Sequence, residues 1–429
     1  MKLFALLLLL CASGPAAGQI NILVGDRGSN RIWRFTDVNN NGIIENPAEV
    51  FPWFEACNAE GTIGIENPNA LFIRSDGLVA AGDQPLHQWY FFQDLNNDGD
   101  AKDMGESRVV TGLGNASGVS TYFPTGGAFD SMGRLLIVNA GSASGPDSVH
   151  RCVDLNANNN FYDPGEMTDF ITTPVFGPDN GPYGPWEMVM TPGDIGYLRN
   201  SIAGLYGVFR FSDSSPVNGR ADDQGEFTPY WTLAASGFTP LSGFAIEPDK
   251  SRPGSLYVQQ TAPGSNDQLI RITDNNGDLD ANDPGEAVLV FSTVEANFIS
   301  IDILCLPNGD VLMSDNSGLR IIRLHDEDGD GLFTSQGERT DIFVSNGSWV
   351  NEVRQLVLLP NLPDPPQCGS ADFNGDGDTG TDLDIEAFFA ALGGDRCCTC
   401  GSADFDADGD TGTDLDIEAF FRVLAGASC

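Results

Sequence analysis

RLHDEDGDGLFTSQGE, at Arg323–Glu338, is the clearest copy of a phrase that recurs along this chain. The phrase is Arg, an apolar residue, any residue and Asp, then an acidic, Asn- and Gly-rich loop that closes on Glu. Four more copies begin at Arg34, Phe91, Arg151 and Arg271, and a degraded copy with one extra residue begins at Arg210. The leading aspartates, Asp37, Asp94, Asp154, Asp213, Asp274 and Asp326, lie 57, 60, 59, 61 and 52 residues apart. A period of this length indicates repeated supersecondary units.

Four short apolar runs accompany each copy of the phrase. Two of them, separated by a Gly-containing turn, precede it, as in IDILCLPNGDVLMSD from Ile301. A third run ends at the loop Asp, and a fourth follows the closing Glu. Four strands in a unit of about 58 residues, repeated six times, are typical of a β-propeller. The sequence therefore predicts an all-β fold, a six-bladed β-propeller over residues 19–361.

The two ends of this region predict how the ring closes. INILVGD at Ile20–Asp26 has the form of a second strand, while Glu352–Asn361 has the form of a spare first strand. Pairing the two would complete one blade and remove the open sheet edges. GDRGSNRIWRF at Gly25–Phe35 resembles the blade phrase of NHL-type propellers. Six-bladed propellers of this kind include hydrolases, lactonases, dehydrogenases and binding proteins, so the resemblance implies a fold and leaves the activity open.

The acidic loops offer the oxygen ligands that calcium prefers. Acids or amides stand at alternate positions, and the closing Glu follows the first Asp by twelve residues in five loops and by thirteen between Asp213 and Glu226. The alternative is a set of solvated acidic hairpins without metal. The predicted ligands are Asp37, Asn39, Asn41 and Glu49; Asp94, Asn96, Asp98 and Glu106; Asp154, Asn156, Asn158 and Glu166; Asp274, Asn276, Asp278 and Glu286; and Asp326, Asp328, Asp330 and Glu338. Because the loops join third to fourth strands at the blade rim, we expect the ions to be structural.

The C-terminal region, residues 371–429, follows a Pro-rich linker at residues 362–370 and contains a duplicated unit. DGDTGTDLDIEAFF occurs at Asp376–Phe389 and again at Asp408–Phe421. In each unit an acidic loop precedes an apolar stripe with helical spacing. The predicted calcium ligands are Asp372, Asn374, Asp376 and Asp384, and Asp404, Asp406, Asp408 and Asp416. We expect the Phe-Phe stripe mainly to pack the two helices together.

This tandem loop–helix region resembles a dockerin module, in particular a short variant that carries GTDxDIEAFF. The resemblance implies calcium binding and docking on a cohesin-like or other cell-envelope protein. Disulfides Cys368–Cys397 and Cys400–Cys429 are one possible pairing, with Cys398 as another candidate, and a zinc site from CCTC is less favoured without nearby His.

The composition restricts location and partners. Residues 1–18 have the charge, apolar run and small residues of a secretory signal peptide, which predicts a secreted or cell-surface protein. Cys11 raises a lipoprotein alternative, although Leu10 is large for that signal. The net charge of −40 argues against nucleic acid as a partner, and no later stretch has the length of a transmembrane segment.

Candidates for catalysis are sparse. Glu187 and Asp302 occupy matching positions early in innermost strands, where they either form a channel site or make hydrogen bonds inside the closed ring. Of the three histidines, only His87 is placed near the usual binding face, and Trp186 and Trp349 either stack on a sugar or fill loops. Two hypotheses remain: a calcium-loaded binding or scaffold propeller with a carbohydrate or protein ligand, and a propeller enzyme acting on a carbohydrate or lactone.

Overall fold

The computed structural model describes the propeller and parts of the C-terminal region. The described residues are 20–45, 49–56, 58, 64–140, 147–172, 184–201, 206–214, 217–232, 238, 242–261, 267–293, 295, 298–347, 349–359, 369–393, 400–401, 403, 405 and 412–425. The predicted signal peptide and most of the predicted linker lie outside them.

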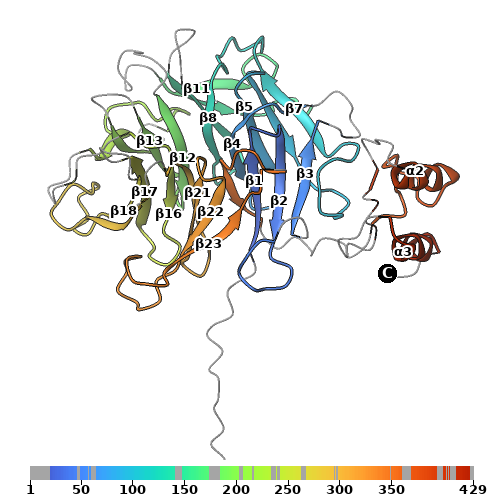
Figure 1. Ribbon diagram of the computed structural model, residues 1–429. Helices are drawn as coiled ribbons and strands as arrows, with labels where there is room; N and C mark the ends of the chain where they lie inside the picture. Colours follow the sequence, from blue (N-terminus) through green and yellow to red (C-terminus); the bar gives the residue numbers. More distant parts are fainter. Residues whose placement is uncertain are drawn as a thin grey trace, which may run out of the picture.

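Six four-stranded antiparallel sheets form the blades of a propeller, as predicted (Figure 1). Blade 1 contains β24 (Leu356–Leu358), β1 (Asn21–Asp26), β2 (Arg31–Thr36) and β3 (Val50–Glu55). Blade 2 contains β4 (Pro68–Ile73), β5 (Val79–Asp83), β6 (Gln88–Phe92) and β7 (Ser107–Gly112), and blade 3 contains β8 (Pro124–Phe129), β9 (Leu135–Asn139), β10 (Ser148–Cys152) and β11 (Met167–Ile171). Blade 4 contains β12 (Pro185–Thr191), β13 (Ile195–Asn200), β14 (Gly207–Phe211) and β15 (Phe227–Trp231). Blade 5 contains β16 (Ile246–Pro248), β17 (Ser255–Thr261), β18 (Asp267–Thr273) and β19 (Ala287–Ser292), and blade 6 contains β20 (Ser300–Cys305), β21 (Val311–Asp315), β22 (Arg320–Leu324) and β23 (Arg339–Val344).

The ring closes between the two ends of the propeller region. Strand β24 pairs antiparallel with β1, with Leu23 opposite Val357. The spare strand predicted within Glu352–Asn361 is therefore the innermost strand of blade 1, and the closure prediction is confirmed.

The hydrophobic core consists of one buried cluster in each of the six interfaces between neighbouring blades. Trp33 of blade 1 packs with Leu312 of blade 6, and Trp89 of blade 2 packs with Ile137 of blade 3. Both faces of each sheet are covered, which explains why the strands read as almost continuous apolar runs. The stability of any blade therefore depends on both of its neighbours.

Polar side chains at the ends of second strands fix the segment that enters the first strand. Asp83 accepts hydrogen bonds from the Glu66 and Asn67 backbone N–H groups at 2.5 and 3.2 Å, and the Asn139 side-chain oxygen accepts one from Phe123 at 2.9 Å. Asp26 binds two backbone N–H groups just before β24 in the same way. The sequence shows this recurring polar position, but its role was not predicted.

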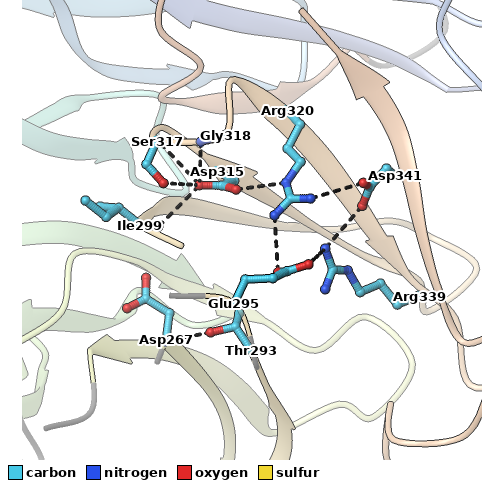
Figure 2. Close-up of polar contacts among 10 residues, drawn as sticks. All are labelled: Asp267, Thr293, Glu295, Ile299, Asp315, Ser317, Gly318, Arg320, Arg339 and Asp341. Atoms are coloured by element: carbon cyan, nitrogen blue, oxygen red, sulfur yellow. Dashed lines mark hydrogen bonds and ion pairs between the residues drawn. The ribbon is translucent and has the colours of Figure 1, made fainter. Parts of the chain in front are cut away.

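Blade 6 adds an ion network to this arrangement (Figure 2). Asp315 accepts from the Ile299 N–H at 3.3 Å and from Arg320 Nε at 2.8 Å. Arg320 also contacts Glu295 and Asp341, each at 3.2 Å, and Arg339 contacts the same two acids. Since Glu295 follows blade 5, the network connects blades 5 and 6.

The C-terminal region contains helices α2 (Asp382–Leu392) and α3 (Asp414–Leu424), which lie outside the ring (Figure 1). Phe388 and Phe420 stack with ring centroids 4.0 Å apart, inside a cluster that includes Phe373 and Phe405. The stripe therefore packs the helices together, as predicted for these two residues. Phe389 and Phe421 differ, since 46% and 45% of their surfaces are exposed.

Candidate functional sites

We call the segment between the third and fourth strands of each blade a rim loop. In the rim loop of blade 6, the Asp326 carboxylate accepts the Gly331 N–H at 2.9 Å. Glu338 is buried and accepts the Glu327 N–H at 3.2 Å and the Ser335 N–H at 2.6 Å. The first acid thus curls the loop, and the closing acid ties its two ends together.

The C-terminal loop before α2 has the same internal hydrogen bonds. Asp372 accepts the Gly377 N–H at 2.9 Å, five residues on, as Asp326 does from Gly331. The buried Asp384 accepts the Phe373 and Thr381 N–H groups at 2.9 and 2.7 Å, at the positions where Glu338 binds. The shared twelve-residue spacing therefore reflects a shared loop conformation. A shorter Asp serves here because it also caps the first turn of a helix.

The rim loops also connect neighbouring blades. In each loop, a residue seven positions after the first Asp, or eight in blade 4, donates its N–H to the outermost strand of the preceding blade. The six bonds run from Ile44 to Ile342, Ala101 to Trp53, Phe161 to Val110, Ala221 to Phe170, Ala281 to Tyr230 and Phe333 to Val290, at 2.7, 2.9, 2.7, 2.8, 2.7 and 2.8 Å. All six donor residues have buried side chains. An interaction that stabilises a rim loop therefore also stabilises the contact between two blades at the rim of the ring.

The repeated Arg of the third strand reaches the rim loop of the next blade. Arg34 donates to the Gly99 carbonyl at 3.3 Å, and Arg271 donates to the Gly331 carbonyl at 2.9 Å. The Arg151 and Arg323 guanidinium groups lie against Gly219 and Gly42 in the same relation.

Two interfaces depart from this Arg–Gly pattern. Blade 2 has Phe91 in place of the Arg, and the loop of blade 3 that faces it has Asn159 in place of the Gly. Blade 4 keeps Arg210, but the loop of blade 5 has Leu279 at the glycine position, in a left-handed conformation with φ 76°. Wherever the glycine is present, the arginine of the preceding blade lies against it, which one repeat taken alone does not reveal.

The rim loop of blade 6 brings three acidic side chains close enough together to hold a metal ion. Carboxylate oxygens of Asp326, Asp328 and Glu338 all lie within 4.8 Å of one another. Each carboxylate oxygen has two lone pairs, so acceptance of a backbone N–H leaves capacity for an ion. The residues fit calcium, which takes oxygen ligands only. Among the described residues this is the one group of three acidic side chains that converge so closely.

The other predicted ligands have different outcomes. Those of the loops of blades 1, 2, 3 and 5 lie in the same type of curled loop, held by a buried closing Glu. Asp404, Asp406 and Asp408 lie outside the described residues, while Asp416 is buried and accepts the Phe405 N–H at 2.7 Å.

A further acid in the rim loops was not predicted. It stands three residues before the closing Glu, and in four loops it accepts a hydrogen bond from an Asn side chain. These acids are Asp103, Asp163, Asp223 and Asp283. Burial and the charges of Asp98 and Asp100 raise the pKa of Asp103 to about 7. The recurrence of the acid at this place was the available signal.

The second candidate site is a cavity of about 530 Å³ in the central channel, lined by innermost strands of the blades. Its walls are mainly apolar. Glu187 of β12 accepts the Ile246 N–H at 2.8 Å, and Asp302 of β20 accepts the Ile303 and Leu356 N–H groups, both at 2.7 Å. These acids line the channel, and they also make hydrogen bonds between blades.

The carboxyl groups of Glu187 and Asp302 also lie close enough to interact electrostatically. Burial, with the nearby charge of Asp302, raises the pKa of Glu187 well above its usual range, and burial raises the pKa of Asp302 to about 7. The two carboxyl groups therefore hold their protons more tightly than ordinary acids do. Such a pair is chemically suited to general acid–base work.

Other polar groups around the channel cavity were not predicted. Glu247 forms an ion pair with Lys250 Nζ at 3.1 Å, and Lys250 also donates a hydrogen bond to the Cys305 carbonyl at 2.6 Å. Burial raises the pKa of Glu247 as well. Sequence reasoning missed Glu247 and Lys250 because β16 has only three residues and its register is hard to read.

The remaining candidates are largely occupied by local packing. His87 stacks on Tyr122 with centroids 4.1 Å apart, and its Nδ1 lies 2.5 Å from the Tyr122 carbonyl oxygen. Trp186 lines the channel cavity against Phe244, whereas Trp349 is 45% exposed. Cys368, Cys397, Cys398 and Cys429 lie outside the described residues, so the proposed disulfides stay predictions.

The fold and the candidate sites show that the protein is a six-bladed propeller with acidic rim loops and a helical C-terminal region. No protein-family model matches the chain, and no curated protein matches its sequence. No helix in the described part of the chain combines the length and apolar character needed to cross a bilayer.

Similar solved structures exist. A PQQ-bound aldose sugar dehydrogenase from Streptomyces coelicolor has 14% identity over 68% of this chain and 85% of its own, with a TM-score of 0.48. A putative 6-phosphogluconolactonase from Bacteroides fragilis has 16% identity over 77% and 97%, with a TM-score of 0.43. Virginiamycin B lyase from Staphylococcus aureus has 14% identity over 77% and 87%, with a TM-score of 0.40. These names cover different chemistries, and none assigns an activity to this chain.

Proposed function

We propose that this protein is an exported, calcium-braced β-propeller that works as a binding or scaffold module and is anchored outside the cell by its dockerin-like tail. The observation that carries the proposal is the rim loop repeated in all six blades, which joins acidic side chains to an inter-blade hydrogen bond. Calcium in these loops would neutralise part of the −40 charge at the places where neighbouring blades meet.

Calcium is expected to raise the melting temperature of the full chain by at least about 5 °C, since an ion that binds only the folded state adds ~2.7 kcal/mol per site at a hundredfold excess over its Kd. The measurement is thermal unfolding in EGTA and in millimolar calcium. Glu338→Gln should reduce the calcium-dependent shift. Glu226→Gln is the matched control, because Glu226 also holds a backbone N–H, at 2.7 Å, in a loop without the middle acids. Identical melting in EGTA and calcium would refute calcium bracing.

The proposed docking surface lies on the C-terminal helices. Leu383 and Leu415 are each 57% exposed, and Phe389 and Phe421 are exposed beside each other with centroids 6.3 Å apart. These residues occupy equivalent places in the two units, so a cohesin-like partner would meet a duplicated apolar surface.

The double substitution Phe389→Ser and Phe421→Ser is expected to reduce capture of a cell-envelope partner at least tenfold, because both rings lose their apolar contact. The measurement is a pull-down with the full chain in calcium, repeated in EGTA. Leu155→Ser, at another exposed apolar residue in a rim loop, is the control and should leave capture unchanged. Equal capture by all three proteins would place the docking surface elsewhere.

A second candidate function is acid–base catalysis in the channel on a carbohydrate or lactone. The raised pKa values of Glu187 and Asp302, beside a mainly apolar cavity, favour it. The variant that separates catalysis from a purely structural pair is Glu187→Gln, whose pH dependence is treated below.

A further inference from the structure

The degraded repeat of blade 4 coincides with a second large cavity, of about 820 Å³, on the side of the propeller that carries the rim loops. Its lining comes from the rim loop of blade 4, from the turns between the first and second strands of blades 3 and 4, and from Leu279 of blade 5. This is where the Arg–Gly pattern changes: the blade 4 loop has an extra residue, and Leu279 replaces the glycine that Arg210 would meet. Arg210 is therefore in a different setting from Arg34 and Arg271, whereas Arg151 still lies against Gly219.

The cavity is lined by three arginines, one of which has an N–H donor without an acceptor among the described residues. Arg151, Arg134 and Arg210 all line it. Arg151 Nε is buried without a hydrogen-bond partner in the described part of the chain, and its closest ion contact, Asp213, is 3.8 Å away. Burial and the charge of Arg134 lower the pKa of Arg151. An anion between these guanidinium groups would relieve their repulsion.

The acids that line the cavity already accept hydrogen bonds from neighbouring groups. Asp213 accepts the Asn218 and Gly219 N–H groups at 2.9 and 2.8 Å. Asp194 accepts the Ser131 N–H at 2.8 Å and its hydroxyl at 2.7 Å, and Asp130 accepts Arg134 Nε at 2.5 Å. The acids therefore do not fill the hydrogen-bonding capacity of Arg151.

Three apolar side chains on the surface of the cavity are largely exposed to solvent. Val217 is 77% exposed, Met132 is 73% exposed and Leu279 is 56% exposed. Leu279 also holds the left-handed backbone conformation that four of the other five rim loops reserve for glycine, at a cost of about 1 kcal/mol or more. An exposed leucine in strained backbone gains nothing for folding, which indicates that its side chain contributes to binding.

We propose that this cavity is a binding site for an amphipathic anion, an aliphatic or aromatic carboxylate whose charged end meets Arg151 and Arg210 and whose apolar body lies on Val217, Met132 and Leu279. Guanidinium groups suit a carboxylate because their N–H donors match its two oxygens. The site is separate from the channel cavity and from the predicted calcium ligands of the loop in blade 6.

Titration calorimetry of the full chain in calcium tests the site, with hexanoate as the probe and hexanol and inorganic phosphate as comparisons. Hexanoate should bind at least tenfold more tightly than either comparison, because only hexanoate supplies both the charge and the apolar body. Arg151→Gln combined with Arg210→Gln should weaken hexanoate binding at least tenfold, and Val217→Ser, at an exposed position that folding does not need, at least threefold. Arg27→Gln, at a 51% exposed arginine in another part of the ring, is the control and should leave binding unchanged.

Several results would overturn the proposal. Absence of hexanoate binding up to about 20 mM would remove the site, since even weak carboxylate binding falls in the millimolar range. Equal binding of phosphate would reduce it to an inorganic anion site, and equal binding of hexanol would show that the arginines play no part. Unchanged hexanoate binding in Val217→Ser together with the double Arg variant would place the probe elsewhere.

Discussion

A chain that ends at Asn351 is expected not to fold into a stable propeller, whereas a chain that ends at Asn361 is expected to fold almost as the full protein does. The two differ by β24 and its flanks, residues 352–361. Without β24, strand β1 has an unpaired edge, and blade 1 loses the buried side chains of Leu356, Val357 and Leu359. Burying three side chains of this size contributes ~1.5–3 kcal/mol each.

The loss extends beyond blade 1. Asp302 would lose the Leu356 N–H, and Asp26 would lose the Glu352 N–H. Together these losses are comparable with the 5–15 kcal/mol typical of a whole domain. The measurement is calorimetry with size-exclusion chromatography: the longer chain should melt cooperatively near the full protein, and the shorter one should aggregate or show no transition. A cooperative transition in the shorter chain would mean that β24 is dispensable.

The fold could be predicted because a propeller repeats the same sequence pattern in every blade. Six copies of the loop phrase gave the number of blades, and the unpaired strand after the sixth copy gave the closure. Within each repeat, the spacing of the acids also indicated the loop conformation. Glu338 and Asp384 both accept the N–H of the residue three positions before them.

Relations between repeats could not be predicted in the same way. Arg34 and Gly99 lie 65 residues apart, and nothing in the sequence says that the third strand of one blade faces the rim loop of the next. Glu187 and Asp302 were recognised as equivalent positions, but their electrostatic interaction depends on the curvature of the ring. Pocket formation at blade 4 likewise depends on an extra loop residue and on Leu279, which comes from another blade.

Glu187→Gln is expected to change the pH dependence of stability by on the order of 2 kcal/mol between pH 5 and pH 9. In the native protein the pKa values of Glu187 and Asp302 are raised in the folded state. The stability contributed by the protons of these two acids is therefore complete at low pH, and it is lost as the pH rises through about 7, where Asp302 ionises. The amide in the variant accepts the Ile246 N–H as Glu187 does, and it carries no titrating proton.

The variant should accordingly be more stable than the native protein at pH 9, and the difference should shrink or reverse at pH 5. Urea unfolding of both proteins at each pH gives the difference directly, and Glu386→Gln, at an exposed acid on α2, is the control with no expected effect. Parallel pH curves for the native protein and Glu187→Gln would contradict the raised pKa of Glu187.

The same variant also decides between the two roles of the channel. General acid–base catalysis typically contributes 10²–10⁴-fold, so an amide at position 187 should remove that factor from any activity found on sugars or lactones. Catalysis and stability would then move in opposite directions at pH 9, which no loss of folding can imitate. If stability rises while the activity is unchanged, the pair belongs to the framework of the ring, and the channel ligand is bound without acid–base chemistry.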